Sequence, residues 1–254
     1  MAFLGVSSLL FAASVAVTIV WCTSMSAMGG MPMPGGWTMS MTWMRMPGQT
    51  WPGAAVSFLG MWVVMMVAMM LPAVLPVLRR YRESVGATTG TLNRLTALVG
   101  AGYFVVWTAL GAAVYPVGAA LAEMAMQRPG LSRAVPAAIG SIVLIAGALQ
   151  FTRWKARRLA CCRSMLGHEG ALPRDAGGAW RLGLRVGLQC FACCGNLMLI
   201  LLLAGVMDLT AMTAMTAAIT LERVAPAGLR VARAVGLVAV VAGVLLIARA
   251  AALV

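Results

Sequence analysis

The chain has 254 residues, of which 62% are hydrophobic and only 10% are charged. Soluble domains are about 45–50% apolar and about 25% charged, so this composition excludes an ordinary soluble enzyme, and its apolar content excludes a disordered chain. A net charge of +13 would suit nucleic acid only if the basic residues lined one water-facing surface. They separate long apolar runs instead, so we expect a membrane protein without a nucleic-acid partner.

Apolar runs divide the chain into about seven helical segments that are candidates for crossing a lipid bilayer, whose core takes about 20 apolar residues per helix. The segments are 2–22, 53–78, 95–122, 134–152, 182–205, 209–226 and 234–248. The sixth is short and contains Glu222 and Arg223, so a re-entrant segment is the alternative there. The predicted fold class is all-α: a polytopic transmembrane helical bundle, with residues 1–254 forming a single integral membrane domain.

Basic residues are divided unequally between the two sides of this bundle. Residues 79–94, 153–185 and 222–233 hold fifteen of the nineteen Lys and Arg residues, and the opposite side holds four. Because Lys and Arg stay on the cytoplasmic side, we expect the N-terminus inside, the C-terminus outside and the bacterial inner (plasma) membrane as the location. Segment 2–22 lacks the basic start and small-residue cleavage site of a signal peptide, so we expect a retained helix.

The predicted outer loop, residues 23–52, is rich in methionine. Its glycines and prolines predict an irregular conformation. Its methionines are Met25, Met28, Met31, Met33, Met39, Met41, Met44 and Met46. Thioethers are soft ligands that select Cu(I), so the loop is a candidate for copper capture. The alternative is that these residues fill apolar gaps and pack on Trp37, Trp43 and Trp51.

The second segment carries a double stripe of methionines on a helix that we expect to end near Pro72 and Pro76, which should bend it. The stripes consist of Met61, Met65 and Met69, with Met66 and Met70 beside them. Residues four apart share one helix face. Helix packing explains any single methionine, whereas the doubled stripe favours a soft-metal site.

The basic cytoplasmic loop, residues 153–185, contains the vicinal thiols Cys161 and Cys162 and the chain's single histidine, His168. Basic residues next to a membrane favour contact with anionic lipid, which is the default interpretation. The alternative is that the two thiols and the imidazole receive a metal on the reducing side of the membrane.

The fifth segment carries a cluster of sulfur ligands. Cys190, Cys193, Cys194 and Met198 are spaced so that they fall along one helical stripe. Three thiols and a thioether can converge on one soft metal ion. The alternative is that each cysteine acts as a small apolar residue in a packed bundle, but three within five residues favour metal or redox chemistry.

The sixth segment adds acidic residues to the candidate metal ligands. Asp208 precedes Met212 and Met215 at helical spacing, and Glu222 lies further along the same face. Ionisable groups at membrane depth are costly and are usually functional. The alternatives are that Asp208 caps a helix and that Glu222 forms an interfacial pair with Arg223.

Two strings resemble a bacterial family of predicted metal-binding integral membrane proteins of unassigned function. They are Trp-x-x-Met-x-x-Ala-Met-Met-x-Pro, from Trp62 to Pro72, and Cys-x-x-Cys-Cys-x-x-Leu-Met, from Cys190 to Met198. Gly205, Met207, Glu222 and the region of Pro226 fit as well, and the likeness covers about residues 55–250. The resemblance implies a multi-helix inner-membrane protein that binds metal.

The function that these patterns favour is binding of Cu(I), with copper or another soft metal as the bound ion and transport or handover to a metalloenzyme as the purpose. One alternative is a membrane thiol–disulfide oxidoreductase that uses Cys190 and Cys193 with a quinone. Another is a structural subunit of a larger membrane complex. The sequence contains neither a nucleotide-binding Gly-rich motif with Lys nor a Ser–His–acid set, so we expect no catalytic residues, and the lipid bilayer is the expected partner.

Overall fold

The computed structural model describes residues 2–45, 48–86, 88–164 and 172–252. Within these ranges the predicted all-α class is confirmed, because eight α-helices account for most of the chain. They are α1 (Ala2–Ala27), α2 (Trp51–Val85), α3 (Thr89–Gln127), α4 (Pro129–Leu149), α5 (Arg153–Ser164), α6 (Ala176–Ala204), α7 (Leu209–Val224) and α8 (Gly228–Ala252). Two candidate ligands named above, Met46 and His168, lie outside the described residues.

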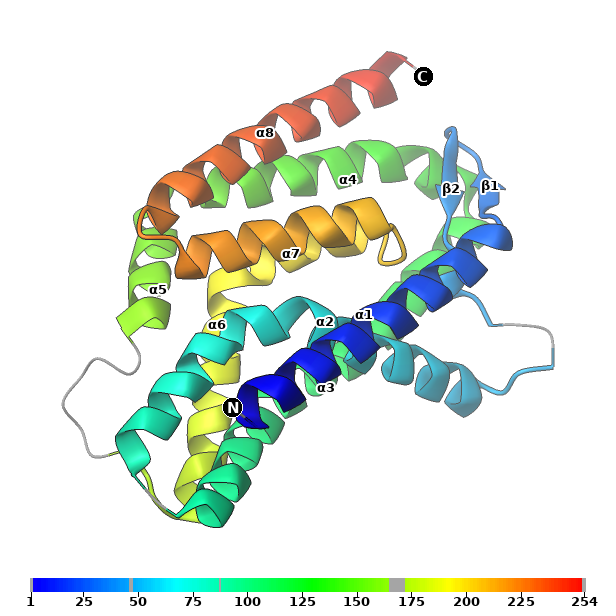
Figure 1. The fold of residues 1–254 in the computed structure, drawn as a ribbon. Coiled ribbons are helices and arrows are strands. Elements are labelled where there is room, and N and C mark those ends of the chain that lie inside the picture. Colours follow the sequence, from blue (N-terminus) through cyan, green and yellow to red (C-terminus); the bar gives the residue numbers. More distant parts are fainter. Residues whose placement is uncertain (1, 46–47, 87, 165–171, 253–254) are drawn as a thin grey trace.

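Six of the described helices are long and apolar enough to cross a membrane: α1, α2, α3, α4, α6 and α8. Each of the seven predicted segments contains a helix, but α7, with 16 residues, is shorter than these six. The prediction that the second helix ends near its prolines is wrong, since α2 continues through Pro72 and Pro76 to Val85. Its ribbon is bent rather than straight (Figure 1), because proline removes a backbone hydrogen bond and clashes with the preceding turn.

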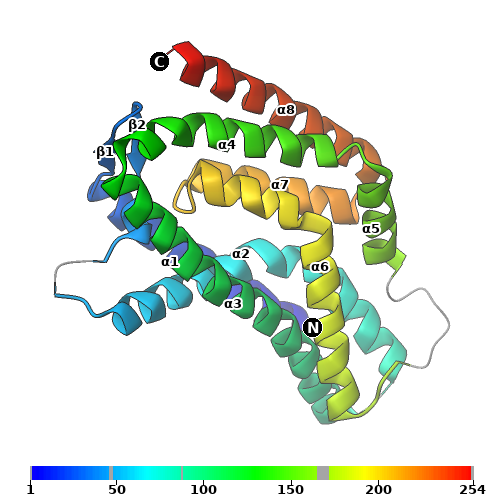
Figure 2. The same cartoon turned by 180° about the vertical axis from the view of Figure 1, so that it is seen from behind.

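The basic loop contains a helix that was not predicted. In α5 the buried residues are Lys155, Leu159 and Cys162, which are spaced four and three residues apart and therefore share one face. Because one of these three buried residues is a lysine, the sequence does not show apolar residues at helical spacing here. Helix α5 packs mainly on α6, at the end of the molecule where α7 and α8 meet (Figures 1 and 2).

The outer loop is a short hairpin rather than an irregular segment. Strand β1 (Met31–Met33) pairs antiparallel with β2 (Trp37–Met39), and a 3-10 turn (Met41–Trp43) follows. Gly35 and Gly36 have φ values of 102° and 73°, which glycine adopts without steric cost and which allow the tight turn. The hairpin is fixed to α4 because Trp37 Nε1 donates to the Ser132 carbonyl at 3.0 Å.

Glycines allow close approach of the helices that make the most extensive contacts. The two largest contacts join α4 to α8 and α3 to α6, and Figure 2 shows α4 and α8 running side by side. Where α3 crosses α6, a Cβ on Gly102 would lie 2.7 Å from the Trp180 carbonyl oxygen, and one on Gly183 would overlap the Val99 carbonyl. Small residues let helix backbones approach closely in membranes, so these glycines hold α6 against α3.

We expect Gly183→Leu to lower the free energy of unfolding by about 2–3 kcal/mol, because the added side chain must push the two backbones apart. The matched control is Gly100→Leu on α3, where a Cβ meets nothing within 4 Å. Thermal unfolding in detergent, followed by tryptophan fluorescence, measures both. Equal melting temperatures for the two variants would show that this crossing does not depend on its glycines.

Candidate functional site

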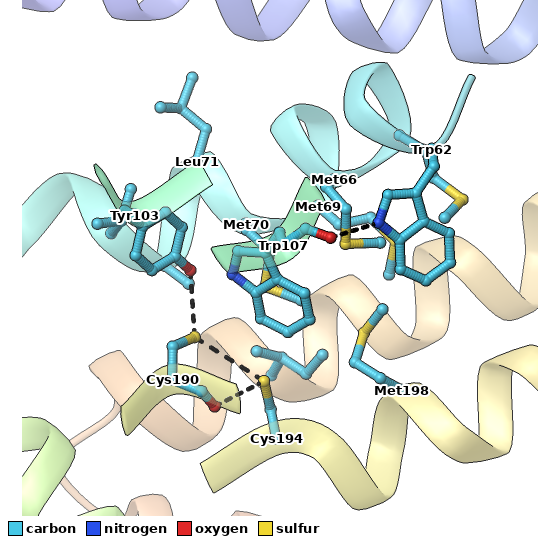
Figure 3. Close-up of a cluster of buried hydrophobic side chains, with 14 of the residues drawn as sticks. Trp62, Met66, Met69, Met70, Leu71, Tyr103, Trp107, Cys190, Cys194 and Met198 are labelled. Atoms are coloured by element: carbon cyan, nitrogen blue, oxygen red, sulfur yellow. Dashed lines mark hydrogen bonds between the residues drawn. The ribbon is translucent and has the colours of Figure 1, made fainter. Parts of the chain in front are cut away.

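Two helices bring seven sulfur-bearing side chains into one buried group, which we call the sulfur cluster. Its members are Met65, Met66, Met69 and Met70 of α2 and Cys190, Cys194 and Met198 of α6. All are less than 5% exposed and belong to one contiguous core. In Figure 3 the labelled methionines of α2 project toward α6, and Met198 projects back toward α2. The methionine stripe and the cysteine helix therefore face each other.

Aromatic residues of α2 and α3 complete the surroundings of the sulfur cluster. Trp62 Nε1 donates to the Trp107 carbonyl at 2.8 Å, which ties the indole of α2 to the backbone of α3 (Figure 3). A Cβ on Gly111 would collide with the Trp62 indole, so glycine is needed at that position for the ring to lie flat against α3. Both tryptophans are at most 2% exposed. The cluster is therefore enclosed by large apolar rings. These rings pack against the sulfur atoms and do not compete with them as metal ligands.

The cysteine pair of the cluster is held by specific hydrogen bonds. The sulfur atoms of Cys190 and Cys194 lie 3.8 Å apart, and Cys194 Sγ donates to the Cys190 carbonyl at 3.0 Å. Cys190 Sγ accepts from Tyr103 Oη at 3.1 Å and from the Arg223 guanidinium at 3.0 Å. Hydrogen bonds from a charged donor favour a charged acceptor, so this sulfur is placed to act as a thiolate.

The distances and charges of this pair suit Cu(I). Two sulfur atoms bound to one metal at ~2.3 Å in a trigonal arrangement lie about 4.0 Å apart. The 3.8 Å between Cys190 Sγ and Cys194 Sγ is close to that separation. The methionines that share the core with this pair are the available source of a third sulfur ligand. One Cu(I) ion with two thiolates carries a net charge of −1, which the buried Arg223 balances. Uncompensated charge is costly in an apolar interior.

The third thiol of the cysteine helix lies elsewhere. Cys193 packs with Leu159, Cys162 and Ala232 in a separate small cluster between α5, α6 and α8. A hydrogen bond with Cys193, together with burial, raises the pKa of the Cys162 thiol, so Cys162 stays protonated at neutral pH. The expected convergence of Cys190, Cys193 and Cys194 on one stripe is therefore not what the structure has: two thiols face α2 and one faces α5.

Glu222 is buried, as its proposed role required, but it has other partners than expected. Its carboxylate accepts from Lys155 Nζ at 2.7 Å and from Gln150 Nε2 at 3.0 Å, and Lys155 Nζ also donates to the Cys193 carbonyl at 2.8 Å. Glu222 therefore forms its ion pair with the buried Lys155 and not, as the alternative predicted, with Arg223. Glu222 therefore links α7 to α4 and α5 and does not face the thiols.

Asp208 is the N-cap of α7. Its Oδ1 accepts from the backbone N–H groups of Thr210 and Ala211 at 2.8 and 3.0 Å, and the residue is exposed. Capping satisfies backbone donors that have no partner within the helix. The capping alternative stated above thus describes its position, and its carboxylate fixes where α7 begins.

Sequence reasoning missed three residues that contact the cysteine helix: Tyr103, Lys155 and Arg223. Lys155 was counted only as a basic residue that orients the chain, and Arg223 as one of these and as a pairing partner of Glu222, although Lys155 is fully buried and Arg223 is 8% exposed. The available signal for Arg223 was its position next to Glu222 inside a candidate span, where an ionised group requires a partner. Tyr103 carried no comparable signal in an apolar run.

Among the described residues, no three His, Cys, Asp or Glu side chains are grouped closely enough to hold a metal ion. A family model for a copper chaperone, PpoB2, matches residues 59–246. The chain belongs to the PpoB2 copper chaperone family. This membership connects the chain to copper and agrees with the resemblance to metal-binding membrane proteins. A search of curated proteins and a search of solved structures gave no match.

The range of the PpoB2 match separates the sulfur residues into two groups. Residues 59–246 include every member of the sulfur cluster, together with Tyr103 and Arg223. Helix α1 and the methionine-rich hairpin precede that range. The PpoB2 match therefore covers the buried cysteine and methionine site, whereas the outer methionines lie beyond it.

Proposed function

We propose that this chain is a membrane copper chaperone that holds Cu(I) in the sulfur cluster and hands it to a partner metalloenzyme. The observation that carries the proposal is the packing of the α2 methionines against Cys190, Cys194 and Met198 in one buried core, with a guanidinium on the Cys190 sulfur. Soft thioether and thiolate ligands select Cu(I) over harder ions. Membership of a copper chaperone family supports copper as the ion.

The proposed orientation has seven crossings, with the N-terminus inside and the C-terminus outside the bacterial inner membrane. Three of the basic segments meet at one end of the molecule, since Arg80, Arg163 and Arg223 line a common cavity of about 160 Å³. The hairpin lies at the other end (Figure 1). Retention of basic residues on the cytoplasmic side supports placing the hairpin outside. In this orientation α7 completes the seventh crossing in contact with α2, α6 and α8.

Capture and handover of Cu(I) would use sulfur atoms of the hairpin and of the sulfur cluster. Met28 and Met31 of the outer segment are exposed, so their thioethers are accessible to an arriving ion. Met33 and Met39 are buried against α3, as the packing alternative states. Ligand exchange between soft sulfurs would bring Cu(I) from the outer methionines to the sulfur cluster. Delivery from there requires a partner with its own soft ligands.

We expect the purified protein in lipid nanodiscs, kept anaerobic and reduced, to retain Cu(I) but not Zn(II). Zn²⁺ prefers thiolate, imidazole and carboxylate ligands, whereas the sulfur cluster offers mainly thioethers. Competition with a chromophoric Cu(I) chelator gives affinity and stoichiometry, and elemental analysis after buffer exchange checks both metals. Absence of retained copper, or equal retention of zinc, would contradict the proposal.

The oxidoreductase alternative predicts a different outcome in the same material. Its expected pair, Cys190 and Cys193, is divided between two packing clusters, and the nearest thiol contact of Cys190 is with Cys194. Thiol trapping before purification distinguishes the two functions. A Cys190–Cys193 disulfide in the isolated protein would favour redox exchange, whereas copper-protected thiols favour the chaperone.

A further inference from the structure

A second group of sulfur atoms lies where α1 meets the turn between α6 and α7, in the same contiguous core as the sulfur cluster but with none of its residues. Cys22 Sγ is 3.8 Å from Met207 Sδ and 3.9 Å from Met212 Sδ. Cys22 is 2% exposed and Met212 is 4% exposed. The three sulfurs come from three different segments, so their meeting is a product of the tertiary fold and not of helical spacing.

The fold fixes the two methionines independently of the cysteine. Helix α6 ends at Ala204 and is capped by Gly205, whose φ of 128° is suited to glycine. The Asp208 cap then starts α7. Met207 immediately precedes that cap and Met212 lies one turn after it. Both thioethers are thereby presented to the same face of α1, on which Cys22 lies.

The donor set suits one Cu(I) ion. Two sulfur atoms bound to one metal at ~2.3 Å in a trigonal arrangement lie about 4.0 Å apart. The distances from Cys22 Sγ to Met207 Sδ and to Met212 Sδ, 3.8 and 3.9 Å, fit that arrangement. Binding forms one Cu–thiolate and two Cu–thioether bonds, and the Cys22 thiol proton leaves to solvent. The resulting complex is neutral, so it needs no counter-ion in this buried place. A divalent ion would leave one uncompensated positive charge.

We propose that Cys22, Met207 and Met212 form a second Cu(I) site at the hairpin end of the molecule. Helix α1 ends at Ala27, five residues after Cys22, and the methionine-rich hairpin begins at Met31, so the site adjoins the segment that carries the exposed methionines. Cys22 lies before residue 59, where the family match begins. The site deepens the proposed function, since it rests on Cu(I) as the cargo, but its occupancy does not require the sulfur cluster.

The test is a Cu(I) titration of the full chain in reduced nanodiscs, using a chromophoric Cu(I) chelator as competitor. We expect the wild type to bind two ions. Cys22→Ser and Met212→Leu are expected to weaken one of them by about tenfold or more and to leave the other unchanged. Met212→Leu conserves volume, so it keeps the fold. Met215→Leu, a half-buried methionine three residues further along α7, is the matched control.

A spectroscopic readout on the variant Cys190→Ser/Cys194→Ser separates the two sites. X-ray absorption of its one remaining copper ion should show three sulfur ligands, and Met212→Leu in this background should remove one of them. Wild-type stoichiometry and affinities in both Cys22→Ser and Met212→Leu would overturn the second site while leaving the chaperone proposal intact. Loss of all copper in Cys190→Ser/Cys194→Ser would likewise overturn it. A wild type without Cu(I) would overturn both proposals.

Discussion

Replacing Cys190 and Cys194 together by serine is expected to weaken Cu(I) binding at the sulfur cluster by at least about 100-fold. Loss of a residue that only orients a ligand already costs about 10–100-fold in metal affinity, and this change removes both thiolates. Serine hydroxyls are hard donors and do not replace them. The neighbouring thioethers remain, but without a thiolate the Cu(I) charge has no anionic partner.

The measurement is the affinity of each of the two Cu(I) ions in a chelator competition, with Cys161→Ser as the matched control. Cys161 is exposed at the end of α5, so its replacement should leave both Cu(I) affinities unchanged. Thermal unfolding of the metal-free proteins establishes that both variants are folded. An unchanged affinity in the Cys190→Ser/Cys194→Ser variant would remove the sulfur cluster from the proposed function.

The second large effect concerns stability. Glu222→Ala is expected to lower the free energy of unfolding by about 3–5 kcal/mol, the usual cost of leaving one member of a buried ion pair without its partner. Lys155 is fully buried, and its Nζ lies 2.7 Å from the Glu222 carboxylate. After the substitution its ammonium keeps only the Cys193 carbonyl, which does not neutralise it.

The double variant Lys155→Met/Glu222→Leu distinguishes loss of charge balance from loss of packing. Apolar residues of similar volume often replace a buried ion pair at little cost, so we expect it to recover most of the stability lost in Glu222→Ala. Denaturation in detergent, monitored by circular dichroism, measures all three proteins. If the double variant is as unstable as Glu222→Ala, the ion pair is not the source of the effect.

The ion pair also positions a residue that contacts the sulfur cluster. Glu222 holds the end of α7 to α5 and α4 through Lys155 and Gln150. The next residue, Arg223, thereby reaches Cys190 on α6. The structural and chemical roles are thus divided between adjacent residues of one helix, because successive side chains on a helix point in different directions.

The sequence determined the parts of this protein that depend on local spacing. Apolar runs located seven of the helices, and the spacing of Met65, Met69, Cys190 and Cys194 placed each pair on one helix face. These features follow from helix geometry, which repeats every 3.6 residues whatever surrounds it. The same reasoning named the soft ligands, because sulfur chemistry belongs to the residue and not to the fold.

Tertiary structure alone decided which face meets which partner. Cys193 lies only three residues from Cys190, yet the packing of α5 beside α6 draws it toward Cys162. Lys155 is buried rather than solvated because the Glu222 carboxylate and the Cys193 carbonyl accept hydrogen bonds from its ammonium group.

The basic residues and the methionines that the sequence analysis singled out therefore have several roles. Lys155 and Arg223 contact buried groups, and methionines belong to the hairpin packing, to the sulfur cluster and to the Cys22 group. Periodicity along one helix carries no information about the distance to another helix. That distance is set by long-range packing, such as the glycine contacts of α3 with α6, and with it the set of sulfurs that can share one copper ion.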